Sequence, residues 1–176
     1  MHQAADAGGE AVVVRPLRLP ECETVAAIIQ SYANREILLW RTPDDIRLHA
    51  GNFLVAERRG GVVGCVAIQD YGGDLCELRS LAVREEHAGR GIGSALVGAA
   101  VELARTRGAR ELFALTRRVA FFGHRGFAVV PRERFPQKVW RDCVLCRKRE
   151  CCDETAVVIE FGGAGGDGQA GRPDVT

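Results

Sequence analysis

The chain has 176 residues, of which 47% are hydrophobic and 27% are charged, and its formal net charge is +1. This length suffices for one domain with a buried core, and the near-zero charge gives no support for nucleic acid or a charged membrane surface as a partner. No apolar run approaches the roughly 20 residues that span a bilayer, and no basic-then-apolar leader opens the chain, so we expect a cytoplasmic protein without membrane contact.

The apolar pattern predicts one α/β domain over residues 11–161. Residues 1–10 are small and polar and residues 162–176 are glycine-rich, so we expect both ends to be disordered. Strands are predicted at residues 11–15, 52–58, 62–69, 75–83, 109–116, 127–130 and 155–161. Helices are predicted to begin at Pro20 and Pro43 and to cover residues 92–107 and 118–125. This order indicates a mixed, largely antiparallel sheet flanked by helices, with one parallel pair of strands.

A glycine-rich stretch links the central predicted strand to the longest predicted helix. Gly89, Gly91 and Gly93 follow a polar loop and flank the start of this helix at Ile92. Glycine lets a ligand approach the unpaired N–H groups at a helix start, where the helix dipole favours an anion. Such glycines also occur where a strand and a helix only pack closely, and no Walker lysine follows them. A pyrophosphate suits this place, whereas a P-loop does not fit the sequence.

The sequence ELRSLAV at residues 77–83, followed by GRGIGSALV at 89–97, resembles the acetyl-CoA motif of the GNAT N-acetyltransferase superfamily. Ala88 departs from this motif, because the family prefers Gln or Arg there. The resemblance covers about residues 11–161 and implies the GNAT fold, with acetyl-CoA as cosubstrate. Its pyrophosphate would lie on the glycine loop and its pantetheine along the central strand. The implied contacts are Leu81, Ala82, Val83, Gly89, Arg90, Gly91, Ile92, Gly93, Ser94 and Phe122.

Three further stretches, at residues 37–42, 113–122 and 135–146, resemble bacterial N-acetylglutamate synthases of the short, stand-alone form without an amino-acid-kinase domain. These enzymes acetylate the α-amino group of L-glutamate in the first step of arginine biosynthesis. Two alternatives stay open: a GNAT enzyme for another acidic amine or a protein N-terminus, and a non-catalytic module that senses acetyl-CoA or a metal. The sequence does not decide whether the chain forms a homo-oligomer.

Glu77 begins the central strand and matches the position of the glutamate that many GNAT enzymes use as a general base. The acceptor is an ammonium at neutral pH, and a carboxylate can take its proton directly or through water. A surface or salt-bridged glutamate is the alternative interpretation. Where many GNAT enzymes carry a tyrosine that protonates the leaving thiolate, this chain has Phe122, which cannot donate a proton. Backbone N–H groups at residues 81–83 would stabilise the oxyanion if this strand diverges from its neighbour, as in the family.

Glutamate brings two carboxylates, so its pocket should contain arginines, whose guanidinium groups bind carboxylates through two hydrogen bonds. Arg41 lies in the stretch that resembles the family's substrate loop. Arg79 is two residues beyond Glu77, so both project from one face of a regular strand, and Arg79 could equally be a salt-bridge partner of Glu77. Arg117 or Arg118, just after the strand that ends at Thr116, is the third candidate.

The cysteines fall into two groups. Three are isolated in apolar patterns and are expected to be buried: Cys22, Cys65 and Cys76. Cys143 and Cys146 have the spacing of a zinc-binding pair, and Cys151 or Cys152 could supply a third ligand to a structural zinc. The neighbouring positive charges would also favour a redox pair, and incidental thiols in a loop are the third interpretation. The cysteine-containing insertion is placed at residues 131–153.

Overall fold

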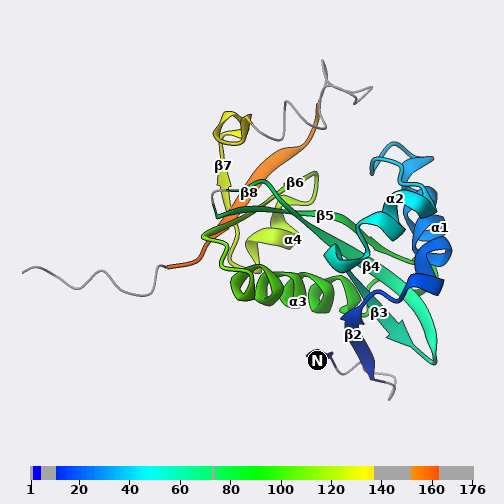
Figure 1. The fold of residues 1–176 in the computed structure, drawn as a ribbon. Helices are drawn as coiled ribbons and strands as arrows, with labels where there is room; N and C mark the ends of the chain where they lie inside the picture. Colours follow the sequence, from blue (N-terminus) through cyan, green and yellow to red (C-terminus); the bar gives the residue numbers. More distant parts are fainter. Residues whose placement is uncertain (1, 5–10, 73, 137–151, 163–176) are drawn as a thin grey trace, which may run out of the picture.

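The computed structural model describes residues 2–4, 11–72, 74–136 and 152–162. In these ranges eight strands form one sheet in the order β1-β2-β3-β4-β5-β6-β8-β7 (Figure 1). The strands are β1 (His2–Ala4), β2 (Val12–Pro16), β3 (Phe53–Arg58), β4 (Gly61–Asp70), β5 (Leu75–Val83), β6 (Glu111–Thr116), β7 (Ala128–Val130) and β8 (Thr155–Glu160). The α-helices are α1 (Cys22–Ala33), α2 (Pro43–Leu48), α3 (Ile92–Thr106) and α4 (Val119–Gly123). Short 3-10 helices are η1 (Leu19–Glu21), η2 (Ala50–Asn52), η3 (Glu85–His87) and η4 (Arg132–Arg134).

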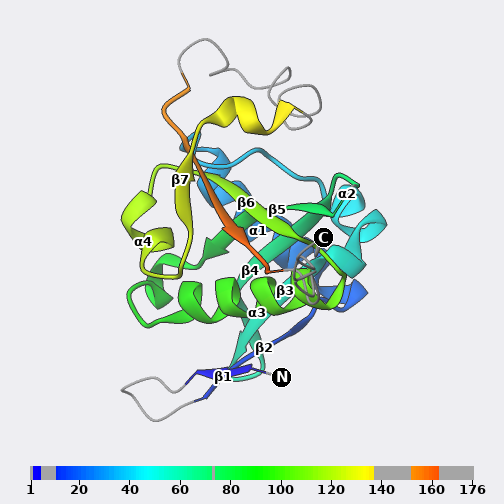
Figure 2. The ribbon, with the colours of Figure 1, turned by 90° about the vertical axis from the view of Figure 1, so that its left-hand side faces the viewer.

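The helices cover both faces of the sheet (Figure 2). The buried residues of α3, such as Leu96, pack with Phe122 of α4 on one face. Those of α1, such as Ile29, pack with Ile46 of α2 on the other face. A third cluster, centred on Phe113 and Phe135, lies over β6 and β8. This arrangement confirms the predicted mixed sheet flanked by helices.

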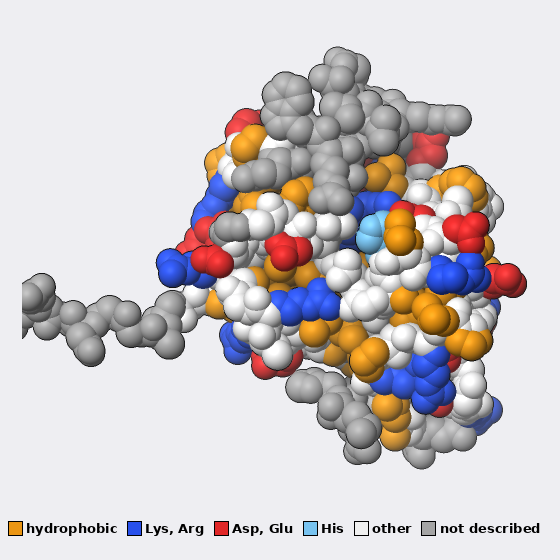
Figure 3. All heavy atoms as spheres, viewed as in Figure 1, with side chains coloured by type: hydrophobic (Ala, Val, Ile, Leu, Met, Phe, Trp, Pro, Cys, Tyr) orange, Lys and Arg blue, Asp and Glu red, His pale blue; other side chains and the backbone are white. Residues whose placement is uncertain are grey.

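Two features of the surface bear on the expectations from composition. No helix within the described ranges has the length and apolar character needed to cross a bilayer. Acidic, basic and apolar side chains are interspersed on the described part of the face in Figure 3, where no broad area of one charge is seen. This distribution gives no support for a nucleic-acid surface on that face.

The first strand differs from the sequence expectation. β1 pairs antiparallel with β2, with Gln3 opposite Val13. The expectation of disorder over residues 1–10 is therefore wrong for His2–Ala4. A strand at the edge of a sheet exposes unpaired N–H and C=O groups, and a short extended segment can bond to them whatever its side chains are. Composition carries no signal for such pairing.

The parallel junction in the middle of the sheet is short. β5 and β6 are joined by three residue pairs, the last of which is Glu77 with Phe113. Both strands continue beyond this pair, to Val83 and Thr116, without further pairing to each other. β5 and β6 therefore diverge, which is the condition for the backbone N–H groups at residues 81–83 to stabilise an oxyanion.

A β-bulge lies in β5 just beyond the point of divergence. Ser80 and Leu81 lie opposite the single residue Val66 of β4, because the register pairs Cys65 with Ala82 and Ala67 with Arg79. Ser80 has a φ of 53°, in the left-handed region that non-glycine residues seldom adopt. Bulges redirect side chains and are frequent beside active sites. This one turns β5 where the two strands separate.

Candidate active site

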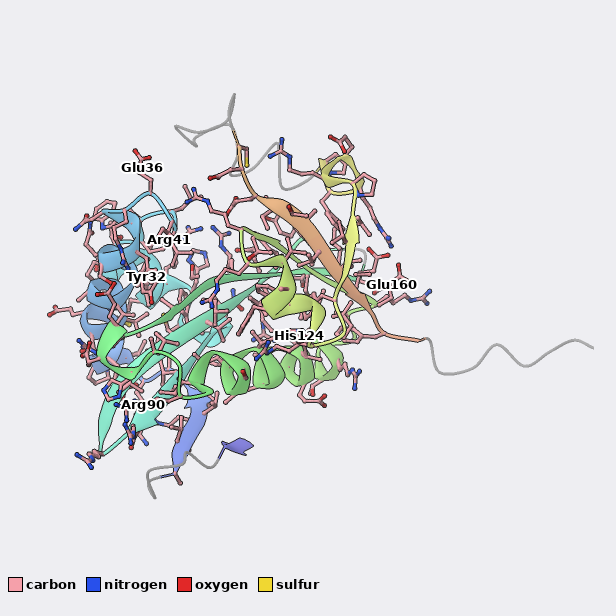
Figure 4. The ribbon with its side chains drawn as sticks, turned by 180° about the vertical axis from the view of Figure 1, so that it is seen from behind. Tyr32, Glu36, Arg41, Arg90, His124 and Glu160 are labelled. Atoms are coloured by element: carbon pink, nitrogen blue, oxygen red, sulfur yellow. The ribbon has the colours of Figure 1, made fainter. Side chains whose placement is uncertain are left out.

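A cleft of about 430 Å³ opens where β5 and β6 diverge. One wall is the unpaired edge of β5 over residues 78–83, and the other is the end of β6 with Phe121 and Phe122 of α4. The glycine loop closes one end, and Tyr32 of α1 lies along the wall. The Tyr32 hydroxyl donates a hydrogen bond of 2.5 Å to the Val83 carbonyl oxygen. All the predicted cofactor contacts except Arg90 line the cleft. Arg90 is exposed and is not part of the lining (Figure 4).

The glycine loop presents the start of α3 to the cleft. Gly91 precedes the helix with a φ of 77°, and its carbonyl oxygen accepts the hydrogen bond of Ala95 N–H at 3.0 Å. The N–H groups of Ile92, Gly93 and Ser94 therefore have no acceptor within the helix, and all three residues line the cleft. Unpaired N–H groups at the positive end of a fifteen-residue helix make a suitable site for a pyrophosphate.

Gly91→Ala is expected to weaken acetyl-CoA binding and to lower the free energy of unfolding. The left-handed φ costs a residue with a Cβ about 1–2 kcal/mol, although no atom lies within 4 Å of an added Cβ. Relief of this strain would move the N–H groups that follow. Urea unfolding and the KM for acetyl-CoA measure the two effects. Gly123→Ala is the matched control, because that glycine also has open space but no positive φ. Equal behaviour of the two variants would contradict the prediction.

Arg125 is a cationic group beside the glycine loop that the sequence analysis did not identify. It lines the cleft and donates hydrogen bonds to the Ser94 side chain and the Phe121 carbonyl oxygen. Its guanidinium carbon lies 3.7 Å from the centre of the Phe121 ring, and its Nε is buried with no hydrogen-bond partner among the described residues. Burial, followed by the charge of Arg118, lowers the pKa of Arg125. A negative charge in the cleft would offset both the cost of burying the Arg125 charge and its repulsion from Arg118.

Glu77 lies at the vertex between the diverging strands. Its side chain is only 3% exposed, and its Oε2 accepts a hydrogen bond of 2.9 Å from the Tyr71 hydroxyl. Arg79 Nη1 lies 3.9 Å from the same oxygen. The predicted neighbourhood of Glu77 and Arg79 on one face of β5 is therefore present. Tyr71 was not identified from the sequence, because it lies in the turn after β4 and only the fold brings it to Glu77.

A second pocket of about 120 Å³ lies on the α2 side of β5. It is lined by Arg41, Arg79, Asp45, His49 and neighbouring residues of β3 and β4. Arg79 and Ser80 line both the cleft and this pocket, so the two cavities are neighbours at the β-bulge.

Helix α2 holds the second pocket in shape. The Thr42 side chain caps the helix by accepting the Asp45 N–H at 3.0 Å. The Asp45 carboxylate in turn lies 3.3 Å from Arg41 Nη1 and 3.4 Å from His49 Nδ1. The lining thus combines arginine guanidinium groups with a single carboxylate, which suits a small anionic molecule.

The other predicted acceptor arginines lie elsewhere. Arg117 and Arg118 line the large cleft and not the second pocket. Arg117 Nε is 2.8 Å from Asp153 Oδ1, and its Nη2 donates a 3.0 Å hydrogen bond to the Glu36 carbonyl oxygen. Arg117 therefore ties the loop after α1 to the segment before β8. Of the four predicted arginines, the structure brings Arg41 and Arg79 together.

The zinc hypothesis falls mostly outside the described residues, which exclude Cys143, Cys146 and Cys151. Cys152 is a half-buried thiol, and the described part of the chain holds no group of three His, Cys, Asp or Glu side chains arranged for a metal. A structural zinc stays a prediction. The three earlier cysteines are buried thiols, as expected, and burial raises the pKa of Cys65 to about 12.

Comparison with known proteins agrees with this geometry. The model of the acetyltransferase (GNAT) family matches residues 19–127, which is more than half of the chain. The chain belongs to the GNAT family. It is an acetyl-CoA-dependent N-acetyltransferase, and both the resemblance and the fold inferred from it are confirmed.

Two relatives of the enzyme are acetyltransferases by name. It is 43% identical over 145 residues to an uncharacterized N-acetyltransferase of Chlorobaculum tepidum, covering 82% of this chain and 94% of the relative. It is 33% identical over 121 residues to an amino-acid acetyltransferase of Mycobacterium tuberculosis, covering 67% of this chain and 69% of the relative.

Among solved structures, a Mycobacterium tuberculosis protein in complex with CoA and NLQ has a TM-score of 0.73 at 27% identity, covering 85% of this chain and 99% of that one. The N-acetylglutamate synthase of Neisseria gonorrhoeae, in complex with coenzyme A and N-acetyl-glutamate, has a TM-score of 0.76 at 25% identity, covering 86% of this chain and 35% of that one. The enzyme therefore spans about a third of the Neisseria protein.

Proposed function

We propose that the enzyme transfers the acetyl group of acetyl-CoA to the α-amino group of L-glutamate, the first step of arginine biosynthesis. The observation that carries this proposal is the second pocket, where two arginines line a small cavity that shares Arg79 and Ser80 with the large cleft. The amino-acid acetyltransferase relatives support the same substrate class. An acceptor in this pocket would have its amine near the β-bulge, beside the thioester.

In this proposal Arg79 and Arg41 bind the carboxylates of the acceptor. Arg79 is the principal contact because it lines both cavities and Arg41 lines only the second pocket. Arg41 also lies closer to a carboxylate, 3.3 Å from Asp45, than Arg79 does to Glu77 at 3.9 Å. Charge-assisted hydrogen bonds of this kind contribute about 1.5–3 kcal/mol each. They would discriminate an acidic acceptor from its neutral amide.

Glu77 then acts as the general base. It lines neither cavity and is 3% exposed, so the proton of the acceptor ammonium would reach it through a water molecule. The amine nitrogen attacks the thioester carbonyl carbon, the C–N bond forms, and the C–S bond breaks to release the thiolate of CoA. N–H groups on the unpaired edge of β5 at Leu81–Val83 would stabilise the oxyanion. Phe122 cannot protonate the thiolate, so this proton comes from another group.

Acetyl-CoA consumption by the purified enzyme, followed by thiol release, tests the proposal. We expect a rate with L-glutamate well above the rates with L-aspartate, L-glutamine, spermidine and no acceptor. A high rate with aspartate or an acidic N-terminal peptide, but not with glutamate, would keep the arginine-lined pocket and replace the acceptor. A preference for spermidine would contradict an anionic acceptor altogether.

A further inference from the structure

Tyr71 is a residue whose contacts point to a part in the reaction. It lies between β4 and β5, where its N–H donates a 3.0 Å hydrogen bond to the Leu75 carbonyl oxygen and fixes the turn. Its hydroxyl donates to Glu77 Oε2 at 2.9 Å. A hydrogen bond to an ionised acceptor restrains a carboxylate more strongly than one between neutral groups.

The ring of Tyr71 also has a defined contact. It packs against Phe113 with ring centroids 5.9 Å apart and planes tilted by 43°. Phe113 in turn stacks on Phe135 at 4.0 Å, and both are almost fully buried. Phe113 is also the strand partner of Glu77 at the last pair of the parallel ladder. The Tyr71 ring and the strand that carries Glu77 thus both contact Phe113 beside the point where β5 and β6 diverge.

Arg79 is the competing partner of this carboxylate. The Arg79 Nη1 atom lies 3.9 Å from Glu77 Oε2, and the Tyr71 hydroxyl donates its 2.9 Å hydrogen bond to the same oxygen. If the carboxylate turned fully to Arg79, a close ion pair would form between the proposed base and the proposed acceptor-binding cation. Each group would then be less available for its own part in the reaction.

We propose that Tyr71 is a positioning residue, which holds the Glu77 carboxylate in the orientation for proton transfer and keeps it from closing on Arg79. This inference rests on the proposed function of Glu77 as the base. Tyr71 lines neither cavity, so the proposal places it outside direct contact with the acceptor and acetyl-CoA. Its part in the reaction is through the carboxylate of Glu77.

Tyr71→Phe removes the hydroxyl and keeps the ring packing. We expect kcat with L-glutamate to fall roughly 10- to 100-fold near neutral pH, with a smaller rise in the KM for glutamate and an unchanged KM for acetyl-CoA. The loss should shrink as the pH is raised from about 7 to about 9.5, because an amine that solvent has deprotonated needs no base. Within the described part of the chain, Tyr71 and Arg79 are titratable groups that contact Glu77, and Phe113, its strand partner in β6, brings no charge.

Phe135→Leu is the matched control, because it weakens the ring stacking and leaves the hydroxyl in place. Any loss of kcat in this variant should be the same at all pH values. The inference is overturned if Tyr71→Phe has wild-type kcat near pH 7, or if its loss is equal at both ends of the pH range. Glu77→Gln, measured beside it, separates the two claims. A fully active Glu77→Gln overturns the base itself, whereas an inactive one with unaffected Tyr71→Phe overturns only the positioning role.

Discussion

Glu77→Gln should reduce kcat with L-glutamate by roughly 10²- to 10⁴-fold, the usual contribution of a positioned general base. The amide has the shape of the carboxylate, and its oxygen can still accept the Tyr71 hydrogen bond, but it cannot take a proton at neutral pH. Acetyl-CoA should bind the variant as tightly as the wild type, because Glu77 is not part of the cleft lining. Thiol release measures turnover, and calorimetric titration with acetyl-CoA measures binding.

Glu160→Gln is the control for this substitution. Glu160 is an exposed residue at the end of β8 that pairs with Arg134, away from the cleft (Figure 4). It should retain full turnover, since exposed ion pairs contribute little to stability. If Glu77→Gln kept more than about a tenth of the wild-type rate, the reaction would not depend on this carboxylate as a general base.

Arg79→Met is expected to have the second largest effect, on the choice of acceptor. Loss of a charge-assisted contact worth about 1.5–3 kcal/mol should raise the KM for glutamate roughly 10- to 100-fold. Methionine retains part of the apolar stem, so the packing at the bulge changes little. The informative quantity is the ratio of kcat/KM for glutamate to that for glutamine, which should fall toward one.

Two further arginines calibrate this result. Arg41→Met should lower the same ratio less, because Asp45 already balances part of its charge. Arg110→Met should leave the ratio unchanged, because that side chain is 76% exposed and pairs with Asp74 outside both cavities. If the ratio were unchanged in Arg79→Met, Arg79 would not be the residue that binds a carboxylate of the acceptor. This outcome would also count against glutamate as the substrate.

Local sequence patterns predicted the elements and the cofactor end of the site. Apolar spacings, together with helix-start residues such as Pro43, located seven of the eight strands and all four α-helices of the described chain. The glycines at 89, 91 and 93 identified the helix start, because a left-handed φ and a close ligand approach both require a residue without a side chain. These are properties of neighbours in the chain.

The contacts between distant segments were harder to predict. Tyr71 lies in a turn, and nothing in the sequence around it indicates Glu77 as its partner. Arg125 lies just after α4, and its partner Ser94 is equally unmarked in the sequence. Arg117 lines the cleft, and its bonds to the Glu36 carbonyl oxygen and Asp153 also join segments far apart in the sequence. Only the packed fold determines such partners, since they depend on how loops of different elements meet.

The three-pair ladder between β5 and β6 leaves the facing edges of both strands without a strand partner over the rest of their length. The pantetheine arm of acetyl-CoA, if it lies along Leu81–Val83 as proposed, would offer amide groups to an edge that has lost its neighbouring strand. The cosubstrate would then complete the sheet as well as supply the acetyl group. Because a ligand that binds only the folded state stabilises it by an amount that grows with ligand concentration, acetyl-CoA would raise the free energy of unfolding of the enzyme as well as serve as its substrate.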